Sequence, residues 1–220
     1  MDPKVERSKR IIEEAVKQYK KIAVAVSWGK DSMVVLHLAL QVKPDIDIFT
    51  VLTPFKPKET FEFKDRVIRE WGIKVREYMS DAKVPEGLYR TNPDECCRIL
   101  KVIPTQKAIE GLDAWITGLR NTEGRTRKEY QEVEIYPDIT KINPILNWTE
   151  ADVWRYTAVH RLPVHPWYGR GYRSLGCEPC TSLGGEEERD GRWRGTPKWG
   201  GECGIHTMHK KQLNKMAQRQ

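Results

Sequence analysis

Short runs of β-branched and small apolar residues alternate with longer stretches of helical periodicity through the first half of the chain. The apolar runs predict buried strands at 21–26, 46–52, 73–78 and 114–117. Apolar residues spaced three or four positions apart predict helices at 5–19, 33–41, 59–71 and 97–110. Strands that alternate with helices indicate an α/β fold with a mostly parallel sheet and helices on both faces.

The pattern changes in the second half of the chain. Thr149 to Asp152 has the composition of a helix N-terminus and predicts a helix that ends near His160. From Pro163 onward the chain is rich in Gly, Pro, Trp and Arg, and residues 184–201 are polar and glycine-rich. We therefore expect one folded domain over residues 1–183 and a flexible tail over 184–220 that carries Cys203.

Composition narrows the class of protein. Of the 220 residues, 39% are hydrophobic and 31% charged, which is typical of a globular protein. No apolar run approaches the ~18 residues of a membrane span, and the charged N-terminus does not resemble a secretory signal. We expect a cytoplasmic protein with no membrane partner. The net charge of +7 suits an anionic partner or a lysine-rich surface equally well, and the basic residues are too scattered to favour nucleic acid.

The first predicted strand leads directly into a loop of small and charged residues. Ser27, Gly29, Lys30, Asp31 and Ser32 occupy this loop, and the next helix follows at once. Backbone N–H groups at such a strand–helix junction bind phosphate. The spacing is not that of a Walker A loop, because Asp follows the Lys. It resembles the PP-loop of the adenine-nucleotide α-hydrolase superfamily, and an ordinary tight turn is the alternative.

Five cysteines divide into two pairs and one single residue. Their odd number, without a secretory signal, argues against a disulfide framework. Cys96, Cys97, Cys177 and Cys180 supply four thiolates, and adjacent cysteines suit two irons of one cluster better than one zinc ion. The pattern favours [4Fe–4S], while buried helix cysteines at 96–97 and a redox pair at 177 and 180 are the alternatives.

Four separate motifs resemble those of the adenylyl-sulfate reductases, in the same order along the chain. They are Cys-Cys followed by basic residues and Pro at 96–104, Thr-Gly-x-Arg at 117–120, Gly-Cys-x-Pro-Cys-Thr at 176–181 and Glu-Cys-Gly-Ile-His at 202–206. The resemblance covers roughly residues 20–207. It implies a PP-loop nucleotide-binding domain over 1–183 with an iron–sulfur site, and a tail over 184–220 with the catalytic Cys203.

The resemblance also implies a reaction. Adenosine 5′-phosphosulfate would bind at the PP-loop, and Cys203 would attack its sulfur to give an S-sulfonate and AMP. Thioredoxin, or glutaredoxin with glutathione, would then release sulfite, in the usual role of sulfate assimilation. Lys101 is implied to lie between cluster and substrate, and His206 to position the tail or donate a proton. Three arginines are implied to neutralise the phosphate and sulfate oxygens: Arg120, Arg189 and Arg192.

Some residues depart from the resemblance and keep alternatives open. Leu52-Thr53-Pro54 replaces the usual Asp-Thr-Gly, while Lys30 and Asp31 are retained as in nucleotide-hydrolysing relatives. The alternatives are a reductase of 3′-phosphoadenosine 5′-phosphosulfate or of both nucleotides, and an ATP pyrophosphatase that thiolates nucleic acid. A zinc-stabilised binding module is a third and weaker alternative. Trp28 is expected to pack in the core or to face adenine, and the sequence leaves a homo-oligomer open.

Overall fold

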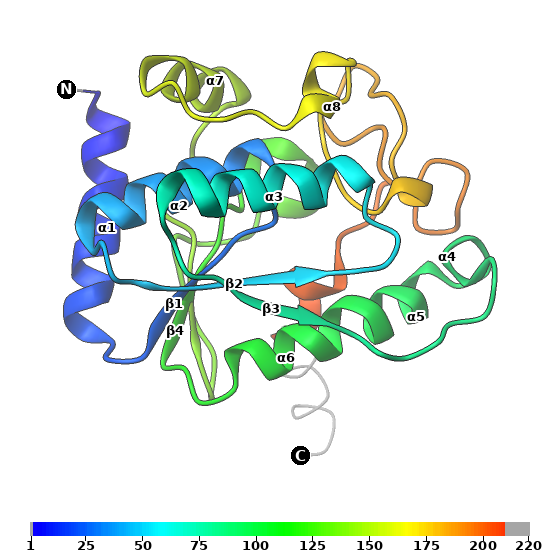
Figure 1. Ribbon diagram of the computed structural model, residues 1–220, viewed down its shortest axis with the longest axis horizontal. Coiled ribbons are helices and arrows are strands. Elements are labelled where there is room, and N and C mark those ends of the chain that lie inside the picture. The colour runs from blue at the N-terminus through cyan, green and yellow to red at the C-terminus, as the bar shows by residue number, and fades with distance from the viewer. Residues whose placement is uncertain (1, 210–220) are drawn as a thin grey trace.

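The computed structural model describes residues 2–209 as one sheet with helices on both of its faces (Figure 1). The strand order is β3-β2-β1-β4-β6-β5, and only the pairing of β5 with β6 is antiparallel. This confirms the predicted α/β fold with a mostly parallel sheet. The strands are β1 Ile22–Ala25, β2 Asp47–Leu52, β3 Arg76–Met79, β4 Ala114–Ile116, β5 Val133–Ile135 and β6 Thr140–Ile142.

The two central strands are buried on both faces. Residues 22–24 of β1 and all of β4 are buried, as strands of a covered parallel sheet should be. Alternate side chains of β1 serve different cores: Val24 packs with the helices of one face, and Ala23 with Phe49 and Trp115 on the other.

Helices cover the two faces unequally. The larger core lies beneath α1 Pro3–Gln18, α2 Lys30–Val42, α3 Lys58–Trp71 and α7 Glu150–Val159. The opposite face is covered by α6 Ile103–Ile109 and by a helical turn at 204–209 that contributes Ile205 and Met208 (Figure 1). The remaining short helices are α4 Leu88–Thr91, α5 Pro93–Cys97 and α8 Pro166–Gly169. Within residues 2–209, no helix combines the length and apolarity needed to cross a bilayer.

The helix predicted at 97–110 is interrupted. It consists of α5, a π-helical turn η1 Arg98–Val102, and α6. Pro104 has no N–H to donate to the preceding turn, so a regular α-helix cannot run through this position. The sequence also missed β5 and β6, because strands of three residues carry too little periodicity to recognise.

The segment predicted as a flexible tail packs against the domain as far as the structure describes it. Glu188, Arg192, Trp193 and Glu202 are all buried. Its mobility stays a prediction, and the part of the predicted tail at 210–220 lies outside the described residues. The packed portion brings Cys203 back to the sheet.

The capping box of α7 generates a prediction about stability. Asp152 accepts hydrogen bonds from the Thr149 backbone and from Lys4, which joins α7 to α1. Burial raises the pKa of Asp152, but the Lys4 and Thr149 contacts outweigh it and lower the pKa to about 2. The stabilisation is thus complete above pH 4 and is lost as the pH falls towards 2.

Asp152→Asn should lower the free energy of unfolding by about 1 kcal/mol at pH 7 and less at pH 3. Urea denaturation at both pH values measures this. Asp45→Asn, which removes an exposed carboxylate paired with Lys43, is the matched control and should change stability by under about 0.5 kcal/mol. Equal losses in the two variants would contradict the role given to the cap.

Candidate active site

The main pocket lies at the carboxyl ends of the central strands. Strand order reverses between β1 and β4, and ligands of open α/β sheets bind at such a point. The pocket wall includes the ends of both strands, at residues 25–27 and 117–118, and reaches Cys203 on the opposite side. The ends of the two central strands and a thiol therefore share one cavity.

The phosphate loop forms the floor of this pocket. Ser27, Gly29, Asp31 and Ser32 all line it, as predicted from the sequence. Ser32 Oγ accepts a hydrogen bond from the Ser27 N–H (3.2 Å) and holds the loop against the first turn of α2. Gly118 allows the close approach of β4, because a Cβ there would lie 2.8 Å from the Ser32 nitrogen.

Trp28 anchors the phosphate loop in the larger core. Its φ of 68° is left-handed, which is unusual for a bulky residue. The indole is 1% exposed within the larger core, and its Nε1–H donates to Thr50 Oγ1 (2.9 Å). Trp28 lies in the core and is not part of the pocket wall.

Lys30 and Arg120, predicted as phosphate ligands, turn away from the pocket and do not line it. Both pair with Glu188, and Arg120 Nη2 lies 2.5 Å from its Oε1. Arg120 Nε also donates to Asp31 Oδ1 (2.6 Å). Burial disfavours the charge of Lys30, but Asp31 and the other carboxylates around it raise its pKa overall. The two cations are thus already neutralised by protein carboxylates.

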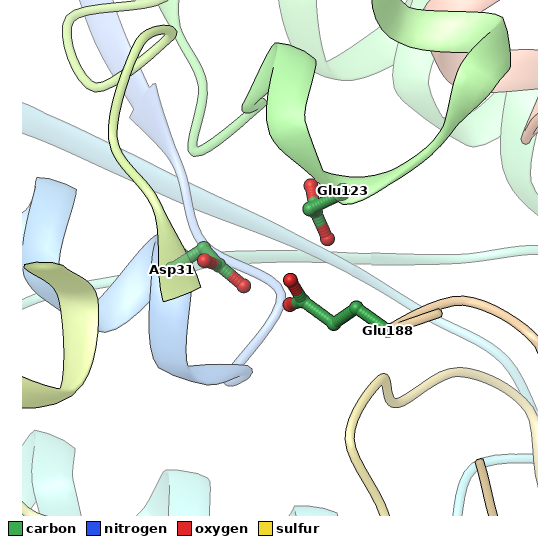
Figure 2. A group of neighbouring side chains, drawn as sticks. All are labelled: Asp31, Glu123 and Glu188. Atoms are coloured by element: carbon green, nitrogen blue, oxygen red, sulfur yellow. The ribbon is translucent and has the colours of Figure 1, made fainter. Parts of the chain in front are cut away.

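Figure 2 shows three carboxylates converging beside the phosphate loop: Asp31, Glu123 and Glu188. Their oxygens lie within 4.8 Å of one another. Such a group has ligands suitable for a cation, but Lys30, Arg120 and Arg127 already pair with it. The three carboxylates belong to a buried ion-pair network.

Other cations do reach the pocket wall. Lys101, Arg189, Arg192 and His206 line it together with Cys203, and all five were predicted. Burial and Arg127 lower the pKa of Arg189 to about 10, while burial and neighbouring cations lower that of His206 well below its usual value. His206 is consequently neutral at pH 7.

Two further cations of the pocket were missed from the sequence. Lys56 follows β2, and Arg127 lies beyond β4. Burial and the adjacent Lys101 lower the pKa of Lys56 to about 8. Both residues follow strands whose carboxyl ends meet at the same edge of the sheet, which is the signal that identifies them.

Several buried donors of the pocket have no partner within the protein. Seven buried side-chain atoms of the described chain lack a hydrogen bond, and four of them belong to residues of this pocket. They are Trp115 Nε1, Arg192 Nε, Trp193 Nε1 and His206 Nδ1. Because an unsatisfied buried donor is costly, these groups indicate a ligand rich in acceptor oxygens.

The position of Cys203 is fixed by the residue before it. Glu202 Oε1 accepts the Cys203 backbone N–H (2.7 Å), and the same carboxylate pairs with Arg127 at 2.6 and 3.0 Å. Arg189 donates to it as well, at 3.0 Å. Ile205 packs on the sheet immediately afterwards. The thiol, which is half-buried, therefore faces the pocket from a doubly anchored segment.

The other four cysteines line one small, mostly apolar cavity beside the main pocket. Cys96 and Cys97 come from α5, whereas Cys177 precedes a short 3₁₀ turn, Glu178–Cys180, and Cys180 ends it. Lys101 lines both cavities and so forms part of the wall between them. The role between cluster and substrate that the resemblance implies for Lys101 stays a prediction.

The four sulfurs, as they stand, are not arranged around a single zinc ion. Four thiolates around one zinc would have sulfurs ~3.8 Å apart, given Zn–S bonds of ~2.3 Å. No three of these sulfurs lie mutually within 4.8 Å in the described chain. Burial, with repulsion between the thiolates, raises the pKa of Cys96 and of Cys180 to about 11, so a cationic group is needed to hold them deprotonated.

The loop that departs from the family pattern lies against this cavity. Thr53 Oγ1 is 3.1 Å from Cys177 Sγ, and the Phe55 carbonyl accepts the Glu178 N–H at 2.7 Å. The departure therefore leaves the loop in contact with the Cys177 segment, and the same loop supplies Lys56 to the main pocket.

Comparisons with known proteins agree with this arrangement. Residues 21–183 match the family described as phosphoadenosine phosphosulfate reductase domain. An adenosine 5′-phosphosulfate reductase of Geobacillus sp. (strain WCH70) is 37% identical over 207 residues, covering 87% of this chain and 86% of the relative.

Solved structures share the fold. Phosphoadenylyl-sulfate reductase of Candida auris superposes with a TM-score of 0.70 at 22% identity, over 80% of this chain and 90% of that one. The U34-tRNA thiolase NcsA of Methanococcus maripaludis, solved with its [4Fe-4S] cluster, gives a TM-score of 0.52 at 17% identity, over 74% and 66%. At these identities the likeness concerns the fold alone.

Removing the Glu202 carboxylate should loosen the thiol segment. Glu202→Gln leaves Arg127 without its forked partner in a buried site, and should lower the free energy of unfolding by about 3 kcal/mol. Alkylation of Cys203 by iodoacetamide should become faster as the anchor is lost. Urea denaturation and mass spectrometry measure the two effects.

Glu187→Gln is the matched control for this prediction, because Glu187 is an exposed carboxylate of the same segment. It should leave both stability and alkylation rate near the wild-type values. If Glu202→Gln behaves like this control, the carboxylate does not anchor Cys203.

Proposed function

We propose that this chain, which belongs to the phosphoadenosine phosphosulfate reductase domain family, reduces adenosine 5′-phosphosulfate to sulfite and AMP through Cys203. It is an oxidoreductase acting on a sulfur group. The observation that carries the substrate is the shared pocket, in which the phosphate loop, unpartnered N–H donors and the thiol surround one space. The relatives named adenosine 5′-phosphosulfate reductase support this choice of nucleotide.

The first step is transfer of the sulfo group. The phosphate of the nucleotide lies on the loop from Ser27 to Ser32, where backbone donors and the start of α2 favour an anion. Arg189, Arg192 and Lys101 face the sulfate oxygens and offset the charge that approaches the thiolate. Cys203 Sγ attacks sulfur, the S–O bond to the phosphate breaks, and AMP leaves with the electron pair. Cys203 now carries an S-sulfonate.

The second step needs an external dithiol such as thioredoxin. One thiolate of the dithiol attacks Cys203 Sγ and sulfite leaves, which gives a mixed disulfide between the dithiol and Cys203. The second thiol of the dithiol then attacks its own partner sulfur in this disulfide and releases the Cys203 thiol. The dithiol is oxidised to a disulfide, and its two electrons account for the reduction of sulfur. All five cysteines are free in the structure, and such chemistry suits the reducing cytoplasm and sulfate assimilation.

The residues at 96, 97, 177 and 180 are suited to a [4Fe–4S] cluster. Bound there, its cationic core would hold the four thiolates deprotonated and would link α5 covalently to the Cys177 segment. Lys101 lies between that cavity and the pocket, and the thiolates of Cys97, Cys177 and Cys203 raise its pKa despite its burial. Lys101 therefore stays charged and orients the sulfo group.

A 3′-phosphorylated nucleotide remains the alternative substrate, alone or together with the first. The specific observation in its favour is the additional cation Lys56 on the pocket wall, since Arg127 is already paired with Glu123 and Glu202. Comparing the two nucleotides in one assay separates the alternatives.

Anaerobically purified protein should release sulfite from adenosine 5′-phosphosulfate when thioredoxin and its reductant are supplied. Cys203→Ser should lower the rate at least 1,000-fold, because the nucleophile is lost. Its iron content should match that of the wild type, which serves as the internal control. Sulfite release undiminished in Cys203→Ser, or absent from iron-loaded wild type with either nucleotide, would overturn the proposal.

Cluster binding has a separate test. Cys97→Ser and Cys180→Ser should each lose most of the absorbance near ~400 nm that thiolate-held clusters give, together with bound iron. Cys203→Ser should keep both signals. A zinc content of one per chain with no visible absorbance in the anaerobic wild type would contradict the assignment.

A further inference from the structure

Glu188 is a buried carboxylate for which the reaction has no use. It lies on the segment that precedes Cys203, and its side chain is 5% exposed. Its Oε1 pairs with Lys30 and lies 2.5 Å from Arg120 Nη2. One oxygen atom thus pairs with two of the cations that were expected to bind the phosphate and sulfate oxygens.

The place that Glu188 occupies is suited to an anion of the ligand. Lys30 begins α2, directly after the loop that binds phosphate, and its Nζ also donates to the Arg173 carbonyl at 2.9 Å. Backbone N–H groups at such a strand–loop–helix junction bind phosphate, and Lys30 is the cation next to them. Here a carboxylate of the protein already satisfies it.

Glu188 also stands at a boundary between two cavities. Glu123 lines both the main pocket and a neighbouring hollow, and Glu188 lines that hollow. The hollow contains three further cations, Arg125, Lys128 and Arg173. Five glutamates line the same hollow: Glu123, Glu150, Glu186, Glu187 and Glu188. The carboxylates of Glu123 and Glu188 therefore separate the phosphate end of the pocket from a neighbouring hollow of mixed charge.

The same carboxylates disfavour additional negative charge. Asp31 and Glu123 lie within 4.8 Å of Glu188, so a polyphosphate entering here would face three negative groups whose cations are already paired (Figure 2). Like charges at such distances in a buried site repel strongly. Burial and Asp31 raise the pKa of Glu188, whereas Lys30 and Arg120 oppose this.

We propose that Glu188 determines substrate specificity by acting as an internal anion at Lys30 and Arg120, where it excludes the polyphosphate chain of a nucleoside triphosphate. The proposal rests on the proposed function in that the pocket holds an adenine nucleotide. It explains why a chain that retains Lys30 and Asp31 can select a nucleotide with one phosphate and one sulfo group. Removing the carboxylate should convert the site into one that accepts triphosphates.

Binding of AMP and ATP to Glu188→Ala tests the proposal by isothermal titration calorimetry without magnesium. Wild type should bind AMP at least tenfold more tightly than ATP. Glu188→Ala should bind ATP at least tenfold more tightly than wild type does, with AMP affinity changed less than threefold. Glu187→Ala removes an exposed carboxylate from the same segment and should leave both affinities unchanged. An unchanged preference in Glu188→Ala would overturn the proposal.

Stability supplies a second measurement, because in the variants Lys30 and Arg120 keep only Asp31 as a close carboxylate partner, and incompletely paired buried cations destabilise the fold. Inorganic pyrophosphate at 1 mM should raise the Tm of Glu188→Ala and of the isosteric Glu188→Gln by several degrees more than that of wild type. If Glu188→Ala folds only when pyrophosphate is present, the proposal is supported. If neither variant gains stability or folds with pyrophosphate, the proposal is wrong.

Sulfite release by wild type distinguishes this inference from the proposed function. A wild type that releases sulfite, with a Glu188→Ala variant that gains no ATP affinity, defeats the role of Glu188 alone. A wild type that releases no sulfite, with a variant that gains ATP affinity, defeats the reaction and leaves Glu188 as a nucleotide filter.

Discussion

Pairing between buried carboxylates of the C-terminal segment and buried cations of the domain is the interaction on which the site depends. Glu188 joins Lys30 and Arg120, and Glu202 joins Arg127. A buried charge is costly unless it is paired, and losing one partner of such a pair typically costs about 3–5 kcal/mol. The C-terminal segment can therefore pack in this position only if both carboxylates form their ion pairs with the domain. In this position the segment closes one end of the pocket and places the Cys203 thiol at the other end.

The same constraint links the two halves of the proposed reaction. Sulfo transfer needs Cys203 inside the pocket, where the Glu202 anchor and the apolar contacts of Ile205 and Met208 hold it. The exchange with a dithiol needs the same sulfur to meet a second protein. Gly200, at a φ of 76°, and Gly204 lie on either side of Cys203 and supply the backbone freedom for that change.

The cysteine cavity makes a second link between distant parts of the chain. It brings α5 against the Cys177 segment, and the π-helical turn after α5 carries Lys101 to the shared wall. π-Helical turns are often found at functional sites, where they redirect one side chain without ending the helix. The turn that Pro104 imposes is consequently the feature that gives both cavities a common cation.

The sequence by itself determined the elements and the chemistry that lies close together along the chain. Alternating apolar runs predicted the parallel sheet, Thr149 and Asp152 predicted the start of α7, and the cysteine spacing predicted two pairs and one lone thiol. These features depend on local periodicity and on motifs of a few residues, which can be recognised without knowing the tertiary contacts.

Only the tertiary structure decided which charges face the ligand. Lys30 and Arg120 have the right residue types and positions for phosphate, yet Glu188, more than 60 residues away from either, takes both. Lys56 and Arg127 reach the pocket instead, because their strands end at the same edge of the sheet. An ion pair forms between whichever buried charges the packing brings within reach, and that long-range choice leaves no periodic signal in the sequence.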